Sequence, residues 1–334
     1  MSKISEIAIY FPKKVFTNED FFKLFPDERD SKTWGKLGIN QRHIIGEQEV
    51  PSDMGLLAAK KLFLENPSLR GEVDYLIFSG HERDHYTPVT ASFLQKKLGL
   101  ATNVGCIDMH QGCASFVHLL AHADGLIQIG AANKVLIITL SSLTNQFHEK
   151  DKSNRFMFGD AATAFIIEKS EESKIESYCF GNDAESNDNI IILDGEHRTP
   201  INEKSYDSFT NRFGQEQWPG YFYQNGAGVF RFILDRVPNT IDEALTKSNL
   251  TREDIDFYLF HQPNAMVLKA LSKIAKLDEE KLIIDLEDCG NTVSVSIPIL
   301  IHNLKKQKKI NPNMNILFCG FGTGMSWNAC IWKT

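Results

Sequence analysis

Residues 105–130 read GCIDMHQGCASFVHLLAHADGLIQIG. We expect a short apolar strand to end near Met109, a tight turn to follow at Gly112, and a helix to begin at Cys113. This helix is apolar on nearly all of its faces, so it should be buried at the centre of the molecule. A strand, a turn and a buried helix in this order are typical of an α/β protein.

The same alternation of short apolar runs and amphipathic segments extends along the chain. The predicted strands are 73–80, 105–109, 134–140, 161–169, 255–261, 314–322 and 326–332. The predicted helices are 53–64, 89–98, 113–129, 228–248, 263–276 and 294–307. Segments 1–170 and 221–334 each end in a pair of adjacent strands, which suggests two similar halves. The polar stretch 171–220 is interpreted as an inserted loop region over an active-site mouth.

Composition narrows the class of protein. Of 334 residues, 42% are hydrophobic and 24% are charged, as in soluble globular proteins. A net charge of −7 does not favour binding to nucleic acid, which is itself negatively charged. No apolar run approaches the roughly 20 residues of a membrane helix, and the N-terminal apolar run is too short for a signal peptide. We therefore expect no membrane association and a cytoplasmic location, where the six cysteines would be free thiols.

Cys113 is the candidate nucleophile. A thiol at the N-terminus of a buried helix lies at the positive end of the helix dipole, which lowers its pKa and favours the thiolate. Gly112 permits the tight turn that would present the sulfur. The alternative for any cysteine is core packing, and it is the interpretation given to four others: Cys106, Cys179, Cys319 and Cys330.

Two further segments carry candidate partners for this thiol. His261 ends an apolar strand, where sites gather in α/β folds, although a loop histidine is the alternative. Asn291 lies in a Gly-Asn-Thr turn, whose default interpretation is simply a turn. A thiol, an imidazole and an amide donor are together what acyl transfer followed by decarboxylation requires.

These segments together resemble the ketoacyl synthase III family. GCASF resembles its nucleophile turn, HQPN its histidine motif and GNTVSVSIP its asparagine motif, and His261 and Asn291 lie 30 residues apart, as in the family. WGKLGINQRHI, FMFGDAATAFIIE and GFGTGMSWNACIW match further family segments. The resemblance covers nearly the whole chain except 171–220.

The resemblance implies an α/β thiolase fold with five αβαβα layers made of two duplicated halves, and a homodimer. It implies that Cys113 accepts an acyl group from CoA or an acyl carrier protein. A malonyl-thioester then loses CO₂ while His261 and Asn291 hold its enolate, and the carbanion attacks the acyl-cysteine. The oxyanion hole would use the backbone N–H groups of Cys113 and Thr323. No metal or redox cofactor is implied.

The resemblance also implies that Trp34 and Lys36 bind CoA or the carrier, with departures from the family pattern. Lys36 replaces an arginine expected to meet a CoA phosphate. Met266 replaces an arginine expected to contact the carrier protein. A specialised member making a secondary metabolite, or modifying a surface glycan or lipid, therefore stays open beside primary fatty-acid initiation.

Charged residues outside the three motifs suggest two further roles. Lys269 and Lys273, with Lys276, share one face of the helix after His261, either as a docking stripe for an acidic carrier protein or as an ordinary exposed face. Glu82 lies 31 residues before Cys113, a spacing that resembles the general acid/base of hydroxymethylglutaryl-CoA synthase. The alternative is a solvated loop in which Glu82 pairs with Arg83 or another neighbour.

Two other functions compete with decarboxylative condensation. One is plain acyl transfer to a hydroxyl or amine, and the other is a catalytically inactive partner subunit. Loss of the histidine–asparagine pair would indicate the first, and loss of the cysteine the second. All three residues are present, so condensation is favoured.

Overall fold

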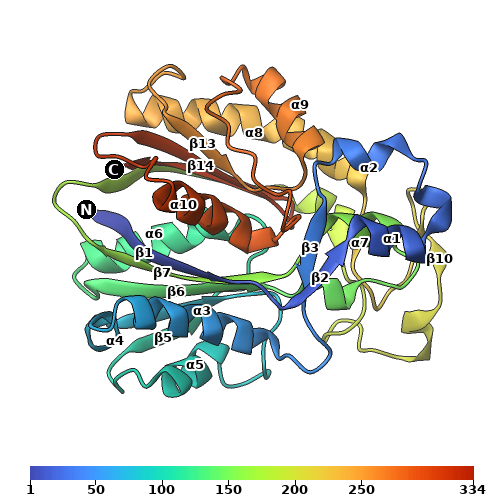
Figure 1. Cartoon of the computed structure of the whole chain (residues 1–334), viewed down its shortest axis with the longest axis horizontal. Coiled ribbons are helices and arrows are strands. Elements are labelled where there is room, and N and C mark those ends of the chain that lie inside the picture. The colour runs from blue at the N-terminus through green and yellow to red at the C-terminus, as the bar shows by residue number, and fades with distance from the viewer.

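The computed structural model describes all 334 residues and contains two main β-sheets with helices between and outside them (Figure 1). The first sheet has the order β1-β7-β6-β4-β5 and the second the order β13-β14-β15-β8. The first consists of β1 (Ser2–Tyr10), β4 (Tyr75–Ser79), β5 (Gly105–Asp108), β6 (Lys134–Ser141) and β7 (Ala161–Lys169). The second consists of β8 (Lys174–Asn182), β13 (Phe257–Phe260), β14 (Asn315–Gly322) and β15 (Ser326–Lys333).

Three apolar clusters hold the layers together. The cluster between the two sheets contains residues of α6 (Ser115–Gln128) and α10 (Ser296–Lys306) together with strands of both sheets. The outer face of the first sheet packs against α3 (Pro51–Glu65) and α5 (Thr90–Leu98), and that of the second against α8 (Gly226–Ser248) and α9 (Ala265–Ala275). Because α6 is covered on both sides, it can be apolar almost all round. The expected αβαβα layering is confirmed.

The two halves share one connectivity. The first runs β1–α3–β4–α6–β6–β7 and the second runs β8–α8–β13–α10–β14–β15. In each sheet the corresponding pairs have the same sense: β4 is parallel to β6 and β13 to β14, whereas β6–β7, β7–β1, β14–β15 and β15–β8 are antiparallel. The first sheet has one further edge strand, β5, which is parallel to β4. In this comparison β8 corresponds to β1 as the first strand of its half.

The expectation of an irregular insertion over 171–220 is therefore wrong for residues 174–182. These form β8, which pairs antiparallel with β15 at the edge of the second sheet. Ser177 has a left-handed backbone with φ 60°, and the ladder shifts register between Ala329 and Ile331. A bulge of this kind breaks the two-residue alternation by which a strand is recognised in sequence.

Each half carries a long excursion between its first strand and its first long helix. The first, residues 11–50, contains β2 (Lys14–Thr17), α1 (Asn18–Leu24), α2 (Lys32–Lys36) and β3 (Gln41–Ile44). The second, residues 183–225, contains β9 (Ile190–Ile191), β10 (Phe209–Thr210), β11 (Glu216–Gln217) and β12 (Tyr223–Gln224). Both excursions gather at the same end of the molecule (Figure 1). The short helices α4 (Leu69–Glu72) and α7 (Lys152–Met157) complete the α-helices.

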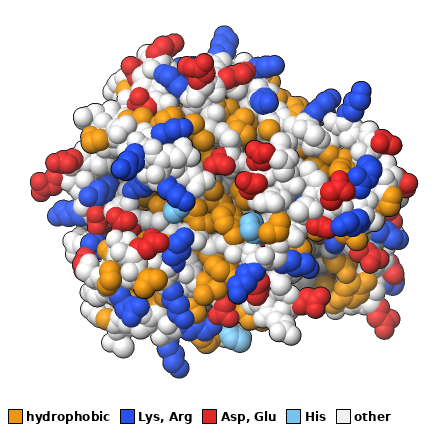
Figure 2. All heavy atoms as spheres, viewed as in Figure 1, with side chains coloured by type: hydrophobic (Ala, Val, Ile, Leu, Met, Phe, Trp, Pro, Cys, Tyr) orange, Lys and Arg blue, Asp and Glu red, His pale blue; other side chains and the backbone are white.

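The surface has mixed charge. On the face in Figure 2, lysine and arginine side chains are interspersed with aspartate and glutamate, as the balanced composition predicts. None of the helices combines the length and apolar character that a membrane span requires.

Two carboxyl groups lie buried beneath the loop that follows β4. Burial raises the pKa of Glu82, and neither of its carboxylate oxygens has a hydrogen-bond partner, although Ser142 lies close enough to offset part of the shift. Burial also raises the pKa of Asp160 to about 7, although Asp160 accepts hydrogen bonds from the backbone N–H groups of Ile45 (2.8 Å) and Thr144 (3.2 Å). The negative charge of Glu82 also raises the pKa of Asp160.

Because Glu82 is buried, we expect the stability of the protein to depend on pH. Because the folded protein holds the pKa of Glu82 above its ordinary value, its free energy of unfolding should fall as pH rises through and above the ordinary glutamate range. Each pKa unit of elevation costs about 1.4 kcal/mol once the group ionises. Glu82→Gln should therefore lose less stability than the wild type between pH 5 and pH 8 in urea unfolding. The exposed Glu65→Gln serves as a control, and parallel profiles for wild type and Glu82→Gln would contradict the prediction.

Candidate active site

Cys113 lies in the turn between β5 and α6, only 9% exposed. The helix begins at Ser115, two residues later than expected, because residues 113 and 114 form a turn closed by a hydrogen bond from Ser115 N–H to the Gly112 carbonyl (2.9 Å). The sulfur is thus presented just before the first turn of the central helix.

Two glycines allow the turn and the β14–β15 hairpin to meet. A Cβ atom at Gly322 would lie 2.6 Å from Cys113 Cβ and 3.0 Å from its Sγ. A Cβ atom at Gly112 would lie 2.6 Å from Thr323 Oγ1 and 2.8 Å from His81 Nε2. Real Cβ atoms do not approach other atoms so closely. Gly322 therefore requires glycine, whereas the atoms near Gly112 are the ends of side chains that can shift. The backbone N–H groups of Cys113 and Thr323 are directed at the Cys113 sulfur.

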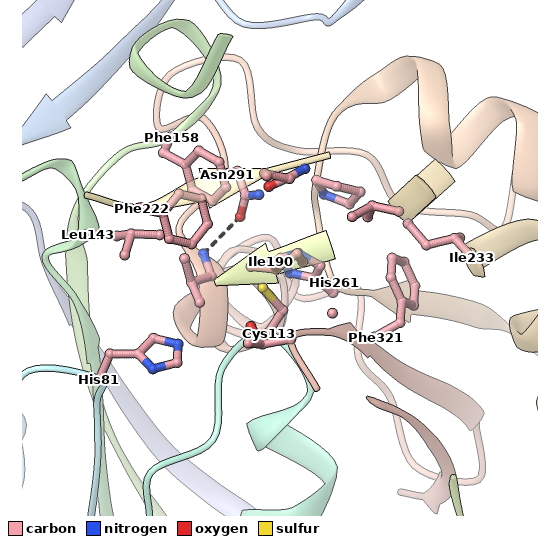
Figure 3. Close-up of a pocket in the computed structure, with 16 residues that line it drawn as sticks. His81, Cys113, Leu143, Phe158, Ile190, Phe222, Ile233, His261, Asn291 and Phe321 are labelled. Carbon is pink, nitrogen blue, oxygen red and sulfur yellow. Dashed lines mark hydrogen bonds between the residues drawn. The ribbon is translucent and has the colours of Figure 1, made fainter. Parts of the chain in front are cut away.

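Cys113, His261 and Asn291 line one small pocket, which we call the catalytic pocket (Figure 3). Cys113 comes from the first half, whereas His261 follows β13 and Asn291 precedes α10 in the second. His261 and Asn291 are 3% and 4% exposed, so both reach the pocket from within the protein. The three candidates taken from separate sequence segments are thus brought together.

His261 is held through its Nδ1 atom, which lies 3.0 Å from Ser296 Oγ. Ser296 also donates a hydrogen bond to the Val293 carbonyl (2.9 Å). With the hydroxyl proton directed there, the Ser296 oxygen accepts from Nδ1–H, and Nε2 keeps a free lone pair. If the hydroxyl instead turns to Nδ1, the proton of the ring lies on Nε2. Burial lowers the pKa of His261 to about 3, so the free imidazole is neutral.

Asn291 is fixed by three hydrogen bonds. Its Oδ1 atom accepts from Val293 N–H (2.9 Å), its own N–H donates to the Met157 carbonyl (2.8 Å), and its carbonyl accepts from Gly159 N–H (3.0 Å). Because Oδ1 is used in this way, the side-chain NH₂ group is the part left for the pocket. Val293 has φ 53°, which is strained for a β-branched residue and typical of functional sites.

The resting thiol is not activated as expected. Burial raises the pKa of Cys113 to about 12, and the N–H groups of Cys113 and Thr323 offset only part of this shift. The expectation of a lowered pKa is wrong for the free protein, because desolvation of the sulfur outweighs the favourable dipoles around it. Cys113 and His261 therefore rest as a neutral thiol and a neutral imidazole.

Glu82 is not among the residues that line the catalytic pocket. Its carboxylate is buried beside Ser142, so the structure gives no geometric support for an acid/base role at Cys113. The alternative, a solvated Glu82 paired with Arg83, is also wrong, since Arg83 pairs with Glu196 (2.6 Å) and both carboxylate oxygens of Glu82 are buried. The side chain that reaches the pocket from this loop is the preceding one, His81.

Helices α2 and α9, which carry the expected CoA and carrier residues, meet where α9 begins. Ala265, at the start of α9, donates its N–H to the Leu37 carbonyl at the end of α2 (2.9 Å). Lys36 on α2 and Lys269 and Lys273 on α9 are exposed, and none is in an ion pair.

Trp34 lies on α2 beside this surface and is half-buried. Its ring packs against Phe21 and Phe156, and its Nε1–H donates to Glu28 (3.3 Å). These contacts leave part of the indole accessible from outside.

Sequence reasoning missed three residues of the site. Ser296 and Val293 lie in the asparagine motif, but their roles depend on a tight turn whose shape the motif does not reveal. His81 lies in HERDH, where all five residues are polar and nothing in the sequence indicates which of them points inward.

Comparison with known proteins agrees with this geometry. Residues 107–184 match the family model of 3-oxoacyl-[acyl-carrier-protein (ACP)] synthase III, and residues 245–334 match the model of its C-terminal part. Beta-ketoacyl-[acyl-carrier-protein] synthase III 2 of Staphylococcus epidermidis is 33% identical over 99% of this chain and 97% of the relative.

Solved structures give the same result. A crystal structure of a 3-oxoacyl-(acyl-carrier-protein) synthase III superimposes with a TM-score of 0.95 at 33% identity, covering 100% of this chain and 99% of the other. A 3-oxoacyl-(acyl-carrier protein) synthase of Burkholderia xenovorans has a TM-score of 0.89 at 28% identity, covering 99% and 93%. The chain therefore belongs to the 3-oxoacyl-[acyl-carrier-protein] synthase III family of acyl-transferring condensing enzymes, with the thiolase fold.

Proposed function

We propose that this chain loads an acyl group from a CoA or carrier-protein thioester onto Cys113 and condenses it with a malonyl-thioester. CO₂ is lost and a 3-oxoacyl thioester is the product. The observation that carries the proposal is the convergence of Cys113, His261 and Asn291 on one buried pocket, with two backbone N–H groups directed at the sulfur.

In the acylation step, the Cys113 sulfur attacks the thioester carbon of the donor. The thiol proton passes to His261 Nε2, whose lone pair is free while Nδ1–H donates to Ser296, and then to the departing thiolate. The N–H groups of Cys113 and Thr323 stabilise the oxyanion that develops. Because burial disfavours a separated thiolate and imidazolium, proton transfer should accompany the attack rather than precede it.

In the condensation step, the malonyl carboxylate leaves as CO₂ and its bonding electrons form a thioester enolate. The Asn291 NH₂ group and His261 Nε2–H donate hydrogen bonds to the enolate oxygen. The Ser296 hydroxyl allows this tautomer by turning to donate to Nδ1. The enolate carbon then attacks the acyl carbon, the bond to Cys113 sulfur breaks, and the sulfur regains a proton from solvent. This chemistry uses only the two thioesters and the protein's own groups.

The other two functions have less support. Acyl transfer to a hydroxyl or amine needs no enolate donor, whereas the Asn291 NH₂ group is left free by the hydrogen bond of its oxygen to Val293. A non-catalytic partner subunit would not need the complete set of three residues. Both thioester substrates belong to cytoplasmic metabolism, so we assign the reaction to the cytoplasm.

The surface formed by Lys36, Lys269 and Lys273 is proposed as the docking site of an acidic acyl carrier protein. Pro263, two residues before the first residue of α9, lines the catalytic pocket, so α9 begins close to the pocket wall. Trp34 provides a partly exposed ring beside this surface for a CoA nucleotide.

A homodimer is also proposed. Strand β5 pairs only with β4, so its other edge is unpaired, and its Ile107 side chain is 36% exposed. Pairing of two such edges would remove an aggregation-prone feature. Sedimentation as a monomer at micromolar concentration would contradict it.

The loading step is tested with Cys113→Ala. Incubation with a panel of acyl-CoA and acyl-carrier thioesters should give a mass adduct on the wild type and none on the variant. Circular dichroism should show that the variant remains folded, because alanine occupies the same turn. A full adduct on Cys113→Ala would overturn the assignment of the nucleophile.

The division of roles is tested with Asn291. In Asn291→Ala, acyl loading of Cys113 should survive, while CO₂ release from malonyl-thioester should fall roughly 10²–10³-fold through loss of one enolate donor. Asn291→Asp keeps an oxygen to accept from Val293 N–H but lacks the NH₂ donor, and should show the same split. If loading and CO₂ release fell together in both variants, the separate roles would be wrong.

The docking surface is tested by charge reversal. Lys269→Glu with Lys273→Glu should raise the apparent KM for carrier-bound substrate, flatten the salt dependence of association and affect CoA thioesters little. Lys60→Glu with Lys61→Glu makes the same charge change on α3, in the opposite outer layer. Equal effects on carrier and CoA substrates, or of both double variants, would leave the lysines as an ordinary exposed face.

A further inference from the structure

His81 stands at the passage between two cavities. The catalytic pocket has a volume of about 30 Å³, room for no more than one or two water molecules. It adjoins an open cleft of about 840 Å³, which we call the outer cleft, built by the loop after β4 and by the excursion 183–225. Five residues line both cavities: His81, Leu143, Ile190, Phe222 and Thr323. An acyl chain that extends from Cys113 into the outer cleft passes between these five residues, His81 among them.

The passage is mainly apolar, and His81 has the only ring in it that can hydrogen-bond. Leu143, Ile190 and Phe222 supply apolar side chains. The neighbouring His110 bonds the Gly80 carbonyl through Nδ1 (2.8 Å), but neither ring nitrogen of His81 has a hydrogen-bond partner in the protein. His81 remains accessible from the cleft, yet the surrounding protein and then His110 lower its pKa. A neutral imidazole thus offers one donor and one acceptor to a ligand.

The position of His81 fixes which part of a ligand it can reach. Its Nε2 atom lies so close to the backbone before the nucleophile that a Cβ at Gly112 would be 2.8 Å away, and Thr323 Oγ1 approaches the same point. The thioester carbonyl is expected at the N–H groups of Cys113 and Thr323. His81 is therefore within reach of the first carbons beyond that carbonyl, rather than of the far end of the chain.

The charges of the outer cleft disfavour a carboxylate as this substituent. Besides the buried Glu82, the cleft is lined by two arginines and three acidic residues: Arg83, Arg198, Asp84, Asp194 and Glu196. Arg83 is already paired with Glu196. The cleft thus has no excess positive charge for an anionic acyl group, and a neutral His81 adds none.

We propose that His81 selects acyl donors that carry an uncharged oxygen substituent close to the thioester, of which a 3-hydroxyacyl group is the type. The imidazole donates to, or accepts from, that oxygen as the chain passes into the outer cleft. This inference rests on the proposed loading of Cys113 and adds a substrate class to it. A site that hydrogen-bonds a substrate hydroxyl discriminates against the analogue that lacks it, because its own polar group is otherwise left unpaired.

The test is a competition between butyryl-CoA and 3-hydroxybutyryl-CoA for Cys113, followed by intact-protein mass. The wild type should favour the hydroxylated donor by about three- to tenfold, the range expected of one hydrogen bond. His81→Leu should bring the ratio close to one. His81→Gln, whose amide nitrogen can approximate Nε2, should restore part of the preference. His85→Leu, on the same loop but away from the catalytic pocket, should retain the preference of the wild type.

The outcomes separate the two proposals. Adducts from both donors with no preference in the wild type, or with the same preference in His81→Leu, would overturn the assignment of His81 and leave the loading reaction standing. The absence of any adduct on the wild type from either donor would overturn loading from CoA, and this inference with it.

Discussion

The active site depends on one close contact: the turn that carries Cys113 meets the β14–β15 hairpin where residue 322 has no side chain. This contact joins the two halves, since the nucleophile belongs to the first and the hairpin to the second. It also brings Thr323 N–H to the sulfur, where it offsets part of the rise in the pKa of Cys113. The backbone contact sets the position of the thiol. The central helices α6 and α10 contribute apolar packing around it.

Burial sets the protonation state of Cys113 and His261. The same desolvation that raises the pKa of Cys113 to about 12 lowers that of His261 to about 3, so both groups are uncharged before substrate arrives. A neutral resting pair is less reactive toward oxidants than a free thiolate would be. The strained backbone of Val293 belongs to this arrangement, because its N–H orients Asn291 and its carbonyl accepts from Ser296, which orients His261. A single turn thus positions two of the three side chains to which we assign the reaction.

Much of this could be predicted from sequence, because long apolar runs and motif spacing persist through folding. The predicted helices and strands of both halves recur in the structure, with ends shifted by a few residues. What could not be predicted depends on local geometry. Strand β8 escaped notice because Ser177 interrupts its alternation. The spacing to Cys113 points to the loop of Glu82 but not to His81, because spacing identifies a loop and not the direction of each side chain in it. The pKa of Cys113 was misjudged because a helix N-terminus is visible in sequence, whereas the density of protein around a sulfur is not.

The two excursions have a consequence for how such an enzyme can change. Residues 11–50 and 183–225 occupy the same connection in the two halves, and neither supplies a strand to the main sheets. One carries Trp34 and Lys36, and the other builds much of the outer cleft. Phe21, Leu37, Ile39 and Ile190 of these loops belong to the cluster on the outer face of the second sheet, so mutations cost little stability only at the exposed positions of the loops. If the proposed contacts hold, exposed positions in one loop can change the preference for the thioester carrier and those in the other the preference for the acyl group, while the residues of the catalytic pocket stay the same.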